Sequence, residues 1–284
     1  MTLKVAIPNK GRLSADSISL LSAVGFTLSQ RDDRQLFYNV GDKYQILSVR
    51  AQDIPAFVES SSVDMGITGL DLVKESGKRV SILSTLGFGK CELVVAVPEH
   101  SSIRGVKDIP AGTKVATTHP NLTRSFFAKK GRKISVVDVS GSVEIAPLMK
   151  VSDIVVDLTE TGSTLKSNGL RPIQSIMKSE AVVISRAGRG RDVRVSELVA
   201  ALKSVTDAAS KRYLMANVPE ARLEDVRALM PGISGPTVMP LSGRKGWVAV
   251  HAVVDEGEVN GVIAMLKGIG ATGVLVLPIE RMVP

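Results

Sequence analysis

The chain has 284 residues, 44% of them hydrophobic, and a formal net charge of +8, so we expect two or three domains with substantial cores and a preference for anionic partners. The first residues show no secretion signal, and apolar runs such as 93–97 are far shorter than the ~20 residues that span a bilayer, which predicts a cytoplasmic protein without membrane spans. One cysteine, Cys91, and three scattered histidines argue against a disulfide framework and a Cys/His metal site.

The first part of the chain alternates strand-like runs with helical stretches. Ser14 is the predicted cap of the first helix, and two alternating runs around Gly41 and Asp42 predict a β-hairpin. The alternation predicts a mainly parallel sheet covered by helices, with ligands at the carboxyl ends of the strands. Strands are predicted over 3–8, 44–50 and 65–69, and helices over 14–25, 53–60 and 71–77.

A second alternating set begins at residue 91. Two small α/β lobes with a cleft between them fit this layout better than one large sheet. Strands are predicted over 91–98, 114–118, 136–140, 153–159 and 180–187, and helices over 121–131, over 143–150 and up to about Asn168.

The pattern changes after residue 195, where a long helix precedes a last group of elements. These elements follow the order βαββαβ, which is the ferredoxin-like arrangement. By analogy of fold, such a unit attached to an α/β body is a regulatory or assembly module. Its strands are predicted over 213–218, 237–241, 247–255 and 273–280, and its helices over 221–232 and 258–270.

The stretch VVDLTETGSTL at 155–165 carries the first candidate site. It places hydroxyl side chains around Gly162, between a strand and a helix. Free N–H groups of Thr161 to Thr164 could bind a phosphate there, but the same hydroxyls could equally cap the helix. Two carboxylates, Asp157 and Glu160, would repel a phosphate unless they bind sugar hydroxyls or Mg²⁺. Both alternatives stay open on these residues alone.

Three other predicted strand ends carry polar or basic side chains. Lys10 and Arg12 flank Gly11 in IPNKGRLS, without the spacing of a P-loop. Asp71 ends MGITGLD, and Asn121 is the predicted helix cap in THPNLTR. Each stretch alone reads better as an ordinary capped turn. Together they lie where an α/β sheet forms its binding crevice.

Taken together, these stretches resemble the ATP phosphoribosyltransferase family, in its long form with a C-terminal regulatory domain. The family signature runs from Glu144 to Thr164-Leu165, and its middle matches through Ser152, Val155, Asp157, Thr161 and Gly162. Lys150 departs from it, because the family usually has glycine there. The resemblance rests on IPNKGRL at 7–13, VRAQDIP at 49–55, MGITGLD at 65–71, LGFGKCEL at 86–93, THPNLTR at 118–124, GSVEIAP at 141–147, DLTETGSTL at 157–165, YLMANVP at 213–219, PTVMPL at 236–241 and VLVLPIE at 274–280.

The resemblance implies the fold and the reaction. Two lobes like those of periplasmic solute-binding proteins would form the catalytic body, with lobe I at 1–90 and 180–210, lobe II at 91–179 and a ferredoxin-like regulatory domain at 211–284. The reaction is the first step of histidine biosynthesis, a pentosyl transfer. N1 of ATP attacks C1 of phosphoribosyl pyrophosphate (PRPP) and expels pyrophosphate, with Mg²⁺ as cofactor on the diphosphate.

The resemblance also assigns site residues. Asp157 and Glu144 would be catalytic, stabilising positive charge in the transition state. Histidine and AMP are the implied inhibitors, and the implied assembly is a dimer that becomes a hexamer. Gly235 stands where the family often has serine, so weaker histidine inhibition is a hypothesis. PRPP would bind at Asp157, Leu158, Thr159, Glu160, Thr161, Gly162, Ser163 and Thr164; ATP at Lys10, Gly11, Arg12, Arg50, Gly69, Asp71, Pro120 and Asn121; and histidine at Asn217, Ile233, Gly235, Thr237 and Gly273.

Two other classes of function share part of this pattern. A two-lobed solute-binding protein would share the α/β pattern without catalysis, but the missing signal and the DLTETGSTL stretch argue against it. Nucleic acid is a weak candidate, because the densest basic stretches, 186–194 and 129–133, contain no aromatic residue on which bases could stack. We therefore expect neither nucleic acid nor a membrane as partner.

Overall fold

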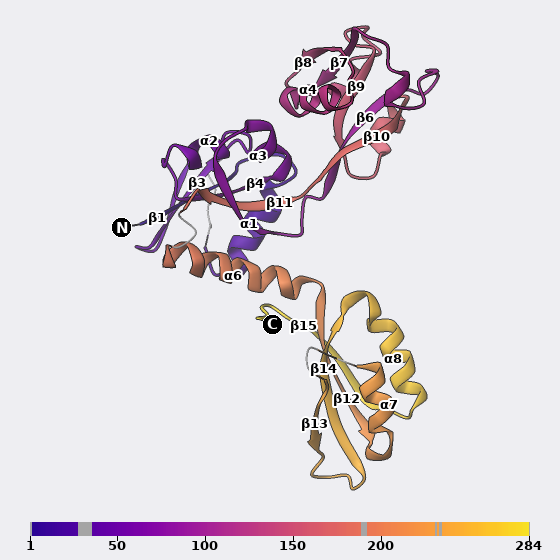
Figure 1. Cartoon of the computed structure of the whole chain (residues 1–284). Helices are drawn as coiled ribbons and strands as arrows, with labels where there is room; N and C mark the ends of the chain where they lie inside the picture. The colour runs from indigo at the N-terminus through magenta and orange to yellow at the C-terminus, as the bar shows by residue number, and fades with distance from the viewer. Residues whose placement is uncertain (1, 28–35, 189–191, 231, 233–234, 284) are drawn as a thin grey trace. The chain divides into compact units, whose positions relative to one another are not determined.

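The computed structural model describes residues 2–27, 36–188, 192–230, 232 and 235–283. The chain forms two compact units, Met1–Val199 and Ala200–Pro284. The first unit contains a six-stranded and a five-stranded sheet, and the second contains a four-stranded sheet (Figure 1). Among the residues described, no helix is both long and apolar enough to span a bilayer.

The first lobe is built on the six-stranded sheet, in the order β2-β3-β1-β4-β11-β5. Its strand β1 runs parallel to β3 and β4, whereas β2 and β11 run antiparallel to their neighbours. The sheet is therefore mixed, and the prediction of a mainly parallel sheet was wrong. In Figure 1, the orange strand β11 lies among the indigo and purple elements of this lobe, although it comes about 100 residues later in the chain than β5. The bounds are β1 Leu3–Pro8, α1 Ser14–Ala23, β2 Phe37–Val40, β3 Tyr44–Val49, α2 Ile54–Glu59, β4 Met65–Gly69, α3 Leu70–Ser76, β5 Val80–Thr85 and β11 Ala181–Arg186.

Most elements predicted for this lobe are confirmed, including the hairpin, whose turn residue Gly41 has a φ of 54°. Ser14 is not the helix cap, because α1 begins at Ser14 itself and Leu13 occupies the cap position without a side-chain hydrogen bond. Strand β5 was not predicted. None of its six residues is fully buried, so its hydrophobic signal in the sequence is weak.

The second lobe is built on the five-stranded sheet, in the order β10-β6-β9-β7-β8. Strand β7 runs parallel to β8 and β9, while β6 runs antiparallel to β9 and β10. Edge strand β10 was missed because Pro172 interrupts its pattern, and its pairing with β6 shifts register there. The bounds are β6 Cys91–Pro98, β7 Thr113–Thr117, α4 Pro120–Lys129, β8 Ile134–Asp138, β9 Ile154–Thr159, α5 Ser163–Ser167 and β10 Leu170–Ser179.

The helix predicted over 143–150 was wrong. Only Val143–Ile145 forms a short 3₁₀ turn. Pro147 has no N–H to donate, and its ring would clash with the carbonyl of Val143 in a continued helix. Lys150 then adopts a left-handed backbone with a φ of 58°, a conformation that glycine reaches at lower cost. The position where this chain departs from the family pattern is thus one that favours glycine.

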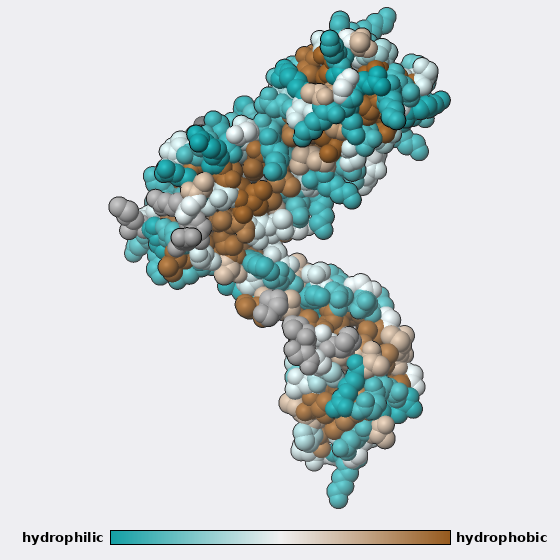
Figure 2. All heavy atoms as spheres, in the orientation of Figure 1, coloured by the Kyte–Doolittle hydropathy of each residue, from teal (hydrophilic) through white to brown (hydrophobic). Residues whose placement is uncertain are grey.

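The second unit follows the predicted ferredoxin-like order, with an antiparallel sheet arranged β13-β14-β12-β15. Alternate residues of β14, Val248 and Val250 among them, are buried with Val226 of α7 and Leu266 of α8. Both helices pack on one face of the sheet (Figure 1). Hydrophilic surface covers much of the side shown in Figure 2, with hydrophobic patches on both units. Helix α6, Val193–Ala209, begins in the first unit and ends in the second. The bounds of the other elements are β12 Lys211–Pro219, α7 Leu223–Leu229, β13 Thr237–Pro240, β14 Trp247–Asp255, α8 Val259–Gly268 and β15 Thr272–Pro278.

Candidate active site

Strand β9 carries a carboxylate to the end of the second lobe's sheet. Its residues alternate between the two faces: Val156 packs with Phe127 of α4, and Val155 packs with Leu165 of α5. Continuing that alternation puts Asp157 on the α5 face. The Leu158 N–H donates to Asp157 Oδ1 at 2.8 Å. Burial raises the pKa of Asp157 to about 6, and the nearby negative charge of Glu144 adds to the rise.

The hydroxyl loop, residues 157–164, is held by hydrogen bonds among its own residues. The Gly162 N–H donates to Thr159 Oγ1 at 2.8 Å, and Thr161 Oγ1 donates to Ser163 Oγ at 2.9 Å. The Ser163 N–H also reaches Thr161 Oγ1, at 3.4 Å. The prediction of free N–H groups was therefore wrong for Gly162 and Ser163, whose donors are bound by loop hydroxyls. Gly162 has a φ of 80°, which makes glycine the natural residue for this turn.

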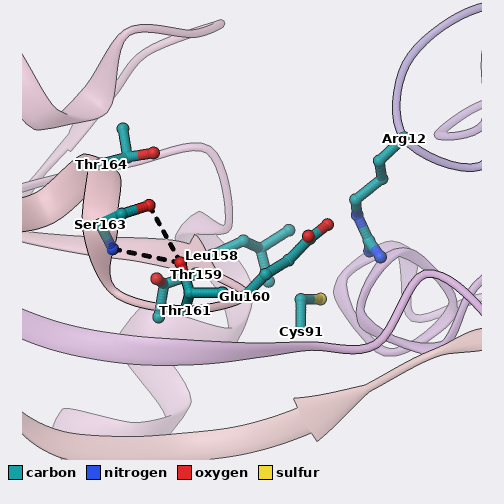
Figure 3. Close-up of a pocket in the computed structure, with 8 residues that line it drawn as sticks. All are labelled: Arg12, Cys91, Leu158, Thr159, Glu160, Thr161, Ser163 and Thr164. Atoms are coloured by element: carbon teal, nitrogen blue, oxygen red, sulfur yellow. Dashed lines mark hydrogen bonds between the residues drawn. The ribbon is translucent and has the colours of Figure 1, made fainter.

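A pocket of about 250 Å³ lies over this loop and reaches the first lobe. Arg12, from the turn between β1 and α1, lines this pocket, and so does Cys91 of β6. In Figure 3 the side chain of Glu160 extends toward Arg12. Lobe I thus contributes a cation to a pocket whose hydroxyls come from lobe II. The remaining lining residues are Leu158, Thr159, Glu160, Thr161, Ser163 and Thr164.

Asp71 lies next to this pocket at the centre of a buried network that we call the Asp71 cluster, consisting of Asp71, Arg12, His119 and Ser179. Arg12 Nη2 lies 2.9 Å from Asp71 Oδ1, which also accepts the Ser179 hydroxyl. On the other side, His119 Nε2 lies 3.1 Å from Asp71 Oδ2. Burial alone would raise the pKa of Asp71, but these hydrogen bonds and the charge of Arg12 hold it below its ordinary value.

The Asp71 cluster draws on four separate parts of the chain. Arg12 also donates to the carbonyl of Gly89, and Ser179 Oγ accepts the Asp71 N–H at 2.9 Å. Gly69 is needed for this arrangement, because a Cβ there would lie 2.4 Å from Asp71 Oδ1. Sequence reasoning did not assign His119 or Ser179 to the site. His119 lies in the THPNLTR stretch, where only Pro120 and Asn121 were assigned, and Ser179 ends β10, a strand that was not predicted.

The other residues predicted for ATP fall into separate groups. Arg50 and Pro120 line a second pocket, of about 570 Å³, together with His119. Lys10 and Gly11 share a turn with Arg12 but are not among the residues that line either pocket. The prediction that Asn121 caps α4 was wrong, because His119 occupies the cap position. Asn121 Nδ2 donates instead to the carbonyl of Glu75 at 3.0 Å.

Possible metal ligands are few. Within the described residues, no three His, Cys, Asp or Glu side chains gather as a metal site would require. The pair Asp157 and Glu144 lie close enough to affect each other electrostatically. Such a pair matches the way Mg²⁺ is usually held, by one or two carboxylates and by substrate phosphates.

The residues predicted for an effector lie on the sheet of the second unit. Asn217 of β12 and Gly273 of β15 come together, since a Cβ on Gly273 would lie 3.1 Å from Asn217 Nδ2. Thr237 lies on β13, beyond β14, so it is not adjacent to them in the sheet. Gly235 has a φ of 95°. Ile233 lies outside the described residues.

The basic stretch 186–194 is only partly described, because 189–191 fall outside the described residues. Arg186 donates to Ser61 Oγ at 2.9 Å, and Arg194 pairs with Asp192 at 2.8 Å. These two guanidinium groups therefore have partners within the chain, which weakens the case for a nucleic-acid surface.

Comparison with known proteins gave consistent results. Residues 50–204 match the family "ATP phosphoribosyltransferase", and residues 208–281 match "HisG, C-terminal domain". An ATP phosphoribosyltransferase of Gemmatimonas aurantiaca is 44% identical over 99% of this chain and 100% of its own length. A chain of the ATP phosphoribosyl transferase (HisG:HisZ) complex from Thermotoga maritima is 30% identical with a TM-score of 0.64, covering 72% of this chain and 99% of that one. The substrate binding protein of an amino acid ABC transporter shares the fold alone, at 14% identity and a TM-score of 0.51, over 74% of this chain and 95% of that one.

Proposed function

The chain belongs to the ATP phosphoribosyltransferase family, whose enzymes catalyse the first step of histidine biosynthesis, and on that premise we propose how its two lobes carry out the transfer. PRPP binds on lobe II and ATP binds mainly on lobe I, so that N1 of the adenine ring faces C1 of the ribose. The observation that carries the proposal is the shared pocket, in which hydroxyls of one lobe face Arg12 of the other.

The hydroxyl loop is proposed to bind the 5-phosphate of PRPP. Phosphate oxygens would replace the loop's own hydroxyls as acceptors for the Gly162 and Ser163 N–H groups, and those hydroxyls would turn to donate. Asp157 and Glu160 are proposed to accept hydrogen bonds from the ribose hydroxyls. Thr159, Thr161 and Thr164 complete the phosphate contacts, and Leu158 supplies the apolar wall.

ATP is proposed to bind beside the Asp71 cluster. Arg12 and Asp71 lie next to the PRPP pocket, and Arg50 and Pro120 line the larger pocket on the far side of His119. A nucleotide that spans both pockets would bring its base to the ribose while its phosphates face cationic side chains. Lys10, Gly11, Gly69 and Asn121 are the remaining proposed contacts.

In the proposed transfer, the bond from N1 to C1 forms while the bond from C1 to the diphosphate oxygen breaks, and pyrophosphate leaves with the electron pair. The ribose carries positive charge in the transition state, which the carboxylates of Asp157 and Glu144 stabilise electrostatically. Arg12 offsets the charge of the departing diphosphate. Mg²⁺, when bound to the diphosphate, would supply further neutralisation, with Asp157 and Glu144 as the protein groups that fit it. Holding two large substrates in register is the main task of the cleft.

The C-terminal unit is proposed to bind histidine as feedback inhibitor at Asn217, Ile233, Gly235, Thr237 and Gly273, with AMP as a second inhibitor. A serine at position 235 would have to adopt the left-handed backbone of Gly235, which costs about 1 kcal/mol for a residue with a Cβ. We keep the hypothesis of weakened histidine inhibition. It would be abandoned if inhibition were strong and Gly235→Ser changed nothing.

The domain limits and the cellular setting also remain proposals. Lobe I is proposed to comprise 1–90 and 180–210, lobe II 91–179 and the regulatory domain 211–284. Sheet membership supports the lobe limits, because β11 pairs with strands of the first sheet. A cytoplasmic enzyme that assembles from dimers to hexamers is proposed from the family resemblance.

The experiment that tests the proposal is a pyrophosphate-release assay with PRPP, ATP and Mg²⁺. We expect pyrophosphate only when both substrates are present, and histidine should inhibit its release. If no pyrophosphate appears while histidine still binds, the proposal reduces to a binding protein with the same fold. Binding to generic DNA at physiological salt would instead revive the nucleic-acid alternative.

A further inference from the structure

Glu75 joins the two lobes in a way that the proposed reaction has not used. Its Oε1 accepts the Asn121 N–H at 2.8 Å, and its Oε2 accepts the Leu122 N–H at 2.9 Å. Its backbone carbonyl also accepts Asn121 Nδ2. Glu75 belongs to α3 of lobe I, and both N–H groups belong to the first turn of α4 in lobe II.

The first N–H groups of a helix have no partner within the helix, and a carboxylate there is favoured by the helix dipole. In the described part of the chain, the cap residue of α4, His119, makes no side-chain capping bond. The carboxylate that accepts these N–H groups belongs to Glu75, which precedes Asn121 by 46 residues in the chain. Stabilisation of the start of α4 by this carboxylate therefore requires contact between the two lobes.

Glu75 and Asp71 are four residues apart on α3, so they lie on one face of that helix. Asp71 contacts the side chain of His119, and Glu75 contacts the backbone directly after Pro120. The two carboxylates therefore hold consecutive parts of one segment of lobe II. Glu75, His119 and Pro120 also line the larger pocket with Arg50, where we propose that the nucleotide binds.

We infer that Glu75 is a positioning residue for the nucleotide substrate: by capping α4 from the opposite lobe, it sets His119 against Asp71 and forms the nucleotide pocket between the lobes. The inference rests on the proposed function for its substrate. The hydroxyl loop lies within lobe II, and Glu75 is not among the residues that line the pocket over it, so PRPP binding should not depend on the contact between Glu75 and α4. Loss of Glu75 should consequently affect ATP and PRPP unequally.

The test compares Glu75→Ala and Glu75→Gln with Glu59→Gln in the full chain. Glu59 is a matched control, because its carboxylate accepts the Arg79 N–H at 2.9 Å entirely within lobe I. For Glu75→Ala we expect the KM for ATP to rise about tenfold, with the KM for PRPP changed less than about twofold, since two charge-assisted hydrogen bonds are lost. Glu75→Gln keeps the side-chain shape and should raise the KM for ATP by about threefold.

Amide hydrogen exchange supplies a readout that does not depend on activity. Exchange at Asn121 and Leu122 should accelerate in both Glu75 variants and stay unchanged in Glu59→Gln. Faster exchange with an unaltered KM for ATP would show that Glu75 only caps the helix, and this would overturn the inference. Equal rises in the KM for ATP and the KM for PRPP would also overturn it. So would unaltered exchange at Asn121 and Leu122. If Glu75→Ala does not fold, the isosteric Glu75→Gln decides alone. Failure of the wild-type chain to release pyrophosphate would refute the proposed function separately, whatever the exchange data show.

Discussion

The hydroxyl loop and the Asp71 cluster are neighbours that are built in opposite ways. The loop is made of consecutive residues, and its hydrogen bonds run between residues two or three positions apart. The Asp71 cluster joins residues 48, 59 and 108 positions apart around a carboxylate that is 1% exposed. We propose that the first exchanges its internal hydrogen bonds for those of a ligand. We expect the second to be rigid, because each of its bonds depends on the packing of several elements.

Removing the carboxylate at the centre of the Asp71 cluster should have the largest effect. Asp71→Ala leaves Arg12 and His119 without their partner in a buried place, so we expect the free energy of unfolding to fall by about 3 kcal/mol. Pyrophosphate release should fall at least ~100-fold as Arg12 loses its position. Urea unfolding and the release assay measure the two effects.

The matched control for Asp71→Ala is Asp207→Ala, which breaks an exposed pair with Lys203 on α6. That change should cost less than about 0.5 kcal/mol and leave pyrophosphate release intact. Similar losses of stability and of pyrophosphate release in the two variants would show that the buried cluster contributes no more than an exposed ion pair.

A backbone change in the hydroxyl loop should reduce activity with little effect on the fold. Gly162→Ala forces a side chain into a left-handed conformation, costing about 1 kcal/mol of stability. Because the same turn aims the N–H groups proposed to bind the phosphate, the KM for PRPP should rise at least ~10-fold. Steady-state kinetics at varied PRPP and thermal unfolding check both parts.

Gly169→Ala is the control for this change. Gly169 also has a positive φ, of 67°, and ends the same short helix but does not line the pocket. It should show a similar loss of stability with an unaltered KM for PRPP. An equal rise in KM for both variants would mean that the loop acts only through general stability.

A further prediction concerns the pH dependence of stability contributed by Asp157. Its pKa rises from 3.8 to about 6 on folding, so the folded chain binds more protons than the unfolded chain between these values. The free energy of unfolding should therefore fall as the pH rises through this range. Asp157→Asn should remove this dependence and raise stability by about 1–2 kcal/mol at neutral pH, while it abolishes transfer.

For the wild-type chain, pyrophosphate release should decline as the pH falls below about 6, where Asp157 takes up a proton. Thermal unfolding of both proteins across this range gives the stability comparison. If Asp157→Asn proved less stable than the wild type at neutral pH, burial would not be the cause of the raised pKa.

The contrast also explains what could be predicted from the sequence. The hydroxyl loop was found because its hydroxyls and glycine are consecutive, and the strands and helices of the βα units follow from hydrophobic periodicity. His119 and Ser179 could not be assigned, because their role arises from strands brought together by the fold. Proline accounts for two wrong predictions. Strand β10 was missed because it contains Pro172, and a helix was predicted over 143–150 although Pro147 prevents it from continuing.

Titration calorimetry of PRPP tests the central claim most directly, namely that PRPP is bound by the local loop and ATP by the non-local cluster. Wild type, Gly162→Ala and Asp71→Asn would each be titrated with PRPP and Mg²⁺. We expect Gly162→Ala to lose most of its affinity for PRPP, while Asp71→Asn keeps affinity close to that of the wild type and still fails to transfer. Retained PRPP affinity in Gly162→Ala, together with its loss in Asp71→Asn, would contradict the account.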